Sequence, residues 1–172
     1  MTHVRTLPAL SLLLAGFALP ACTKPKTDPT NQGPGSVTAA RKYLEGQWTL
    51  LSFTIYPPSA APIEMKGNGT LIYDDFGNLS MNLVPNAATA AVLQKAGIPL
   101  ENGRFASKGR TVLDMQNRTL AYVLEGQPAM GVPTGPLAAN KLRYWQVDGT
   151  TLTLTTKDAG GKPLTVATWQ KH

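Results

Sequence analysis

Residues 46–55 read GQWTLLSFTI, and this stretch decides the fold class. It is rich in β-branched and aromatic residues, which fit the pleated, half-buried surface of a strand. The stretch is followed by Pro57 and Pro58, which lack the backbone N–H that a strand residue donates to a β-ladder. The sequence therefore predicts a strand over Gly46–Ile55 at the start of a β domain.

Further strands are predicted between this stretch and the C-terminus, and turn-forming residues separate them. Their predicted ranges are Gly69–Tyr73, Asn78–Val84, Thr111–Gln116, Thr119–Glu125, Lys141–Val147, Thr150–Thr156 and Leu164–Gln170. The strongest hairpin signal is Asp148-Gly149, because Asp-Gly suits the two central positions of a tight turn. Short connections of this kind predict that strands adjacent in sequence pair antiparallel.

Only one segment is predicted to be helical. Asn86 can cap a run that continues to Ala96, after which Gly97 and Pro99 end the helix. The chain is therefore expected to be all-β, an eight-stranded antiparallel up-and-down barrel with one short helix. Closing the sheet into a barrel removes its exposed edges.

The N-terminus resembles a bacterial lipoprotein signal. Arg5 precedes the apolar run 7–20, and Leu19-Pro20-Ala21 leads directly into Cys22, the single cysteine of the chain. In signals of this type the cut falls before the cysteine, whose thiol takes a diacylglycerol, so the apolar run is a removable address. We expect lipidation at Cys22. The alternative is an ordinary secretory signal that is cut near Ala21.

The chain is thus expected to have three parts. Residues 1–21 are the signal peptide, residues 22–40 are the lipidated cysteine and a flexible tether, and residues 41–172 are the β-barrel domain. The tether is polar and rich in proline, so it cannot repay its ordering entropy by burying apolar surface. Thr23 stands where an Asp often retains lipoproteins in the inner membrane. In a Gram-negative host we therefore expect a lipid anchor in the outer membrane, on its periplasmic side.

Composition argues against most catalytic chemistry. The 172-residue chain has one cysteine and two histidines, His3 in the signal and His172 at the end. Without an internal histidine or a free thiol, the barrel domain cannot build a Ser/His/Asp triad, a Cys/His dyad or a His/Cys zinc site. We expect no enzyme, no metal and no cofactor. The formal net charge is +6, but the basic residues are scattered, so we expect no nucleic-acid partner. We also expect a monomer.

The segment 44–53 resembles the first strand of lipocalin-like domains, whose signature is Gly, any residue, Trp. The stretches Gly69–Tyr73 and Gly77–Met81 resemble the second and third strands of the bacterial lipocalin-like group, and Thr168–Lys171 resembles its last strand. The resemblance spans residues 43–172 and implies a lipocalin-like barrel that is wide enough to hold one small ligand.

The resemblance also implies a closed end. In lipocalins the tryptophan of the signature plugs the barrel, and a basic residue of the last strand stacks over its ring. Gly46 and Trp48 supply the signature here, and Lys171 supplies the cation. The alternative is that Trp48 is a large core residue without a special partner.

Residues on the apolar faces of the strands are the candidates for a ligand lining. They are Tyr73, Met81, Met115, Tyr122, Leu152 and Val166. Arg143 and Trp145 can recognise an anionic headgroup at the mouth, or can be a solvated arginine beside a packed aromatic.

Two functions follow. One is a membrane-anchored lipocalin-like lipoprotein that binds a small apolar or lipid-like ligand in the barrel. The other is a non-enzymatic structural or assembly module of the bacterial envelope, with a barrel filled by its own side chains.

Overall fold

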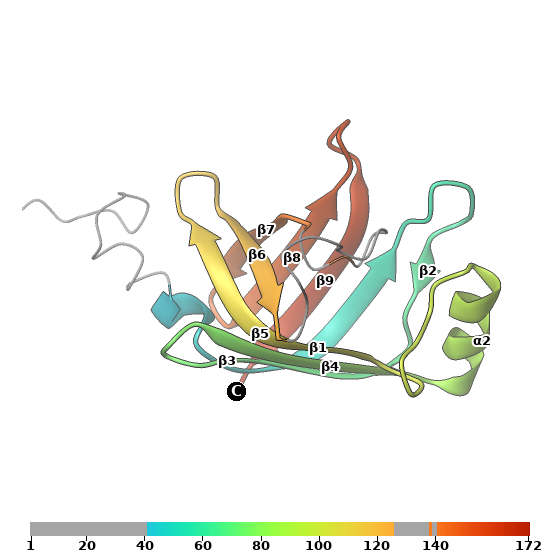
Figure 1. Cartoon of the computed structure of the whole chain (residues 1–172), viewed down its shortest axis with the longest axis horizontal. Helices are drawn as coiled ribbons and strands as arrows, with labels where there is room; N and C mark the ends of the chain where they lie inside the picture. The colour runs from blue at the N-terminus through green and yellow to red at the C-terminus, as the bar shows by residue number, and fades with distance from the viewer. Residues whose placement is uncertain (1–40, 126–137, 139–140) are drawn as a thin grey trace, which may run out of the picture.

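Eight antiparallel strands close into a barrel (Figure 1). The computed structural model describes residues 41–125, 138 and 141–172. The strands of the barrel are β1 (Gly46–Ile55), β3 (Gly67–Tyr73), β4 (Asn78–Pro85), β5 (Phe105–Asp114), β6 (Thr119–Leu124), β7 (Arg143–Asp148), β8 (Thr151–Lys157) and β9 (Pro163–Lys171). They follow one another in sequence order, and β1 pairs with β9 to close the ring. The predicted fold class is confirmed.

Two short elements were not predicted. Strand β2 (Ile63–Glu64) pairs with the end of β1 and lies outside the ring of eight. Residues 41–44 form a second, short helix before β1. A two-residue strand after Pro62 is too short to show an alternating pattern, so the sequence gives no signal for it. The sequence predicted one helix, and the described chain has a second, short one at residues 41–44.

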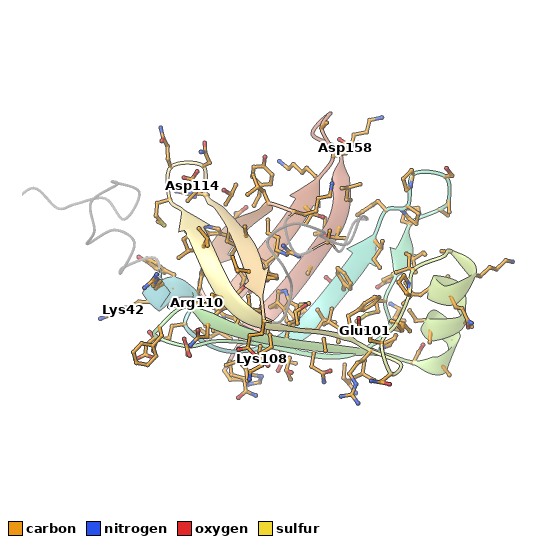
Figure 2. All side chains as sticks on the ribbon, viewed as in Figure 1. Lys42, Glu101, Lys108, Arg110, Asp114 and Asp158 are labelled. Atoms are coloured by element: carbon orange, nitrogen blue, oxygen red, sulfur yellow. The ribbon has the colours of Figure 1, made fainter. Side chains whose placement is uncertain are left out.

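Strand β5 begins at Phe105, well before the predicted start at Thr111. Its first half places Ser107 and Gly109 on the inner face, and Lys108 projects outward (Figure 2). Glycine and lysine are depleted in strands, and an inner face of small residues has no hydrophobic alternation. This half of β5 is a strand because it pairs with β4, where Asn78 lies opposite Arg110, and not because of its local propensity.

The core lies inside the ring of strands. Inward and outward side chains alternate along each strand, and β1 changes phase at a bulge between Leu50 and Ser52, so that Trp48 and Phe53 both point inward. The largest fully buried side chains are Trp48, Trp169, Ile55, Leu71, Leu83, Leu93, Leu120 and Leu152. Most of them come from different strands, so the core forms only when the barrel closes.

Helix α2 (Ala87–Lys95) packs beside β2 and the end of β4 (Figure 1). Asn86 caps it, because its Oδ1 accepts a hydrogen bond from the N–H of Thr89 at 2.9 Å. Leu93 is the fully buried side chain of the helix and joins the core cluster. The predicted helix and its cap are confirmed. Within the described ranges, no helix is long and apolar enough to cross a membrane.

We predict that Gly67→Ala destabilises the barrel strongly. Gly67 has φ +156°, and a Cβ at this position would lie 2.1 Å from the backbone oxygen of Val84. Separating β3 from β4 at this point should lower the free energy of unfolding by about 2–4 kcal/mol. Urea denaturation followed by circular dichroism measures the loss.

The matched control is Gly161→Ala. Gly161 also has a positive φ of +83°, but a Cβ there would meet no atom within 4 Å. It should lose only the backbone preference of glycine, about 1 kcal/mol. If both variants lose the same amount of unfolding free energy, the close approach of Val84 is not the reason that position 67 requires glycine.

Candidate functional site

One end of the barrel, here called the closed end, is sealed by Trp48. Its side chain is fully buried, and its Nε1–H donates a hydrogen bond of 2.7 Å to the backbone oxygen of Leu44 in the helical turn 41–44. The Nζ of Lys171 lies 5.3 Å from the centroid of the indole ring. The pairing of β1 with β9 places Trp48 opposite Lys171, so the closure of the sheet brings the cation to the ring.

Gly46 leaves room for this arrangement. A Cβ at Gly46 would lie 2.9 Å from Cε of Lys171, and Gly46 has φ +125°. A larger side chain would therefore push the lysine stem away from the Trp48 ring. The structure thus brings Gly46, Trp48 and Lys171 together at one end, which is the arrangement that the lipocalin resemblance implies.

A phenol pair lies inside the barrel. The hydroxyl oxygens of Tyr73 and Tyr122 are 2.9 Å apart, and both side chains are buried. Their strands, β3 and β6, are separated by β4 and β5, so the bond spans the interior. Cζ of Arg143 lies 3.9 Å from the centroid of the Tyr122 ring, on the inner face of β7. The interior therefore carries a polar cluster within apolar walls.

Burial sets the acidity of these phenols. Burial raises the pKa of Tyr73 well above its ordinary value, because the phenolate would lose its hydration. Burial also raises the pKa of Tyr122, and the positive charge of Arg143 partly opposes this shift. Both phenols are therefore neutral at physiological pH, and each can donate one hydrogen bond and accept others.

Three more polar groups face the interior. The indole N–H groups of Trp145 and Trp169 and the hydroxyl of Thr111 are buried and have no hydrogen-bond partner in the part of the chain that the structure describes. They lie on the inner faces of β7, β9 and β5. A buried donor without an acceptor costs about 1–3 kcal/mol. A bound molecule with acceptor oxygens would therefore gain the most binding free energy at these positions.

Most of the predicted lining residues lie on the inner face. Tyr73, Tyr122 and Leu152 are buried in the core cluster, and Met81 packs against it half-buried. Met115 follows β5 and is buried outside the principal cluster. Trp145 is half-buried and faces inward.

Val166 is a wrong prediction. It alternates with the buried residues Thr165 and Ala167, so its side chain lies on the outer face of β9. The prediction followed its apolar character, but the inner positions of this strand are held by Thr165, Ala167 and Trp169. Shifting the register of a strand by one residue exchanges its two faces, and the mixed sequence PLTVATWQK does not fix the register locally.

Arg143 is buried, which the sequence did not indicate. Its Nη1 donates to the backbone oxygen of Lys141 at 2.8 Å, and its Nη2 donates to that of Ala138 at 3.3 Å. The predicted alternative of a solvated arginine is therefore wrong. Sequence reasoning also missed the buried hydroxyl pair of Thr156 and Thr165, whose oxygens are 2.7 Å apart.

A groove of about 550 Å³ lies outside the barrel, between α2 and the segment that leads into β2. Its lining combines small apolar side chains with Glu64 and Lys95, both exposed to solvent. Charges in contact with water contribute little binding energy, so this groove is a weaker candidate than the barrel interior.

Neither a metal centre in the described residues nor a similar protein indicates what chemistry the site performs. Among the residues of the described ranges, no group of three or more His, Cys, Asp or Glu side chains could hold a metal ion. No protein-family model matches the sequence, and a search of curated proteins found no match. The chemistry of the site therefore has to be argued from the groups inside the barrel.

We predict that the tyrosine pair makes the fold sensitive to alkali. An unfolded tyrosine ionises near pH 10, whereas Tyr73 and Tyr122 have raised pKa values in the fold. The stabilisation that these two phenols give the folded state is complete below about pH 10. It is lost as the pH rises through the pKa that each phenol has in the folded protein. Tyr73→Phe with Tyr122→Phe should flatten the fall in unfolding free energy between about pH 9 and about pH 11.

The measurement is urea unfolding at a series of pH values, and Tyr144→Phe is the control. Tyr144 is exposed on the outer face of β7. An unchanged slope in the double variant would contradict the assignment of this pH dependence to the buried phenols.

Proposed function

We propose that this protein is a membrane-anchored lipocalin-like lipoprotein of the bacterial cell envelope that binds a small lipid-like ligand inside its barrel. The observation that carries the proposal is the pair of buried indole N–H groups of Trp145 and Trp169, which have no partner within the described ranges. Ligand sites are mostly apolar with a few converging polar groups, and the inner face of this barrel has that composition.

The interior favours an amphiphile over a pure hydrocarbon. The walls offer leucine, methionine and aromatic surface that suits an acyl chain. The indole N–H groups offer donors to an ester, amide or carboxyl oxygen. Arg143, stacked on the Tyr122 ring, adds a positive charge beside the phenol pair, which favours a polar or anionic head group.

A second function is favoured by the density of the core. Trp48, Trp169 and Leu71 are fully buried and point into the same barrel. Side chains alone can fill an eight-stranded barrel. If they fill this one, the protein is a structural or assembly module of the envelope that uses its outer surface.

The anchor is argued from sequence alone, because Cys22 lies outside the described residues. Its position after Arg5 and the apolar run 7–20 supports lipidation, and Thr23 supports an outer-membrane location in a Gram-negative host. Acyl chains contribute about 0.8 kcal/mol per buried methylene, so two or three chains hold a protein on a membrane stably.

We predict that Cys22→Ser abolishes lipidation and blocks processing of the signal. Globomycin, which inhibits the lipoprotein signal peptidase, should make the parent chain accumulate as the same precursor. Mass spectrometry of the N-terminal peptide and membrane fractionation measure both effects. Thr23→Ser is the control and should be processed normally. Normal processing of Cys22→Ser would instead indicate an ordinary secretory signal.

We predict that the protein purified from its host carries a lipid-like mass in native mass spectrometry. Trp145→Phe removes one donor and keeps the aromatic ring, so it should weaken ligand binding about tenfold. Tyr144→Phe, on the outer face of the same strand, should not change binding. A parent protein without bound mass, and without uptake of added phospholipid or fatty acid, would favour the filled barrel.

A further inference from the structure

Two large aromatic side chains are exposed at the closed end. Phe76 is 68% exposed at the tip of the β3–β4 turn, and Tyr43 is 48% exposed in the helical turn before β1. The guanidinium of Arg41 would lie 3.6 Å from a Cβ at Gly77, so the helical turn and the β3–β4 turn are neighbours. Exposed aromatic side chains on neighbouring turns are typical of surfaces that contact a partner or a membrane interface.

Hydrogen bonds to Asp74 order the backbone of the β3–β4 turn at Phe76. Oδ1 of Asp74 accepts hydrogen bonds from the N–H of Phe76 at 2.9 Å and from that of Asn78 at 2.8 Å. The side-chain amide of Asn78 donates to Oδ2 of Asp74 at 2.7 Å. These bonds, led by the side-chain bond to Asn78, lower the pKa of Asp74. A preorganised turn loses little conformational entropy when its tip is buried.

Two exposed basic side chains lie near the β3–β4 turn at this end. Lys42, in the helical turn, and Arg110, on β5, are exposed on the same side of the molecule (Figure 2). Arg110 lies opposite Asn78 in the β4–β5 ladder, which brings it beside the turn that carries Phe76. Asp74 and Asp75, on the same turn, are opposing charges. Lysine and arginine beside an inserted aromatic attract anionic lipid headgroups.

We infer that the closed end docks on a membrane that contains anionic lipid, with Phe76 inserted between the headgroups. The inference rests on the anchor of the proposed function and adds an orientation to it. The described chain begins at residue 41, at this end, so residues 23–40 join Cys22 to the docking surface. Even fully extended, a segment of this length spans at most about 65 Å, and it joins the barrel at this end, so the proposed anchor pulls on the docking surface and not on the opposite end.

The test uses the full chain reconstituted in vesicles whose lipids carry bromine in their acyl chains, which quench tryptophan only at close range. The probes are Phe76→Trp, at the closed end, and Ala159→Trp, in the β8–β9 turn next to Asp158 at the other end (Figure 2). Relative to the parent protein, quenching should be at least about twofold stronger for Phe76→Trp than for Ala159→Trp. Equal quenching of the two variants overturns the inference.

A charge series tests the lipid preference. In the Phe76→Trp background, Lys42→Glu with Arg110→Glu should reduce quenching in phosphatidylglycerol vesicles, and Lys162→Glu at the opposite end should not. Parent-level quenching in the double variant, or equal quenching in vesicles of phosphatidylcholine alone, overturns the anionic preference.

Vesicle flotation separates this result from the proposed function. A chain that does not float with the vesicles lacks the anchor, whereas a chain that floats with equal quenching at both probes is anchored but not docked. Ligand uptake is measured independently by native mass spectrometry.

Discussion

The barrel depends on the pairing of β1 along both of its edges. The first half of β1 pairs with β3, and residues from Trp48 to Ile55 pair with β9. The bulge between Leu50 and Ser52 bends the strand so that it can serve both neighbours and still point its large side chains inward. This pairing removes the sheet edges, and it also places Lys171 opposite Trp48. The sealed end is therefore a direct consequence of closure.

Polar groups inside this barrel have an energetic cost that a purely structural core avoids. One hydrogen bond joins the phenols of Tyr73 and Tyr122, and another joins the hydroxyls of Thr156 and Thr165. The indole N–H of Trp169 is buried without an acceptor in the described chain, at a cost of about 1–3 kcal/mol. A typical domain has only about 5–15 kcal/mol of stability. A ligand with acceptor oxygens would offset this cost, which is the physical case for the binding proposal.

Local signals predicted the parts of the fold that local chemistry controls. The range of β1 matches its prediction, and the helix starts after Asn86, whose side chain caps it. The first half of β5 and the two-residue β2 lack alternation, so only tertiary pairing defines them. The inner face of β9 was misassigned at Val166 because its register is set by β1 and β8. The contact of Tyr73 with Tyr122 joins distant strands, and no short motif encodes it.

The sealed end also constrains how a ligand could reach the interior. Leu44 and Trp48 fill that end, and the proposed docking surface around Phe76 lies outside it. Helix α2 and the turn at Asp158 lie away from the helical turn 41–44 (Figures 1 and 2). If the closed end rests on the bilayer, a ligand has to enter from the side that faces away from the lipid. In that orientation, the proposed ligand would come from the aqueous compartment or from a carrier, and not directly from the bilayer under the closed end.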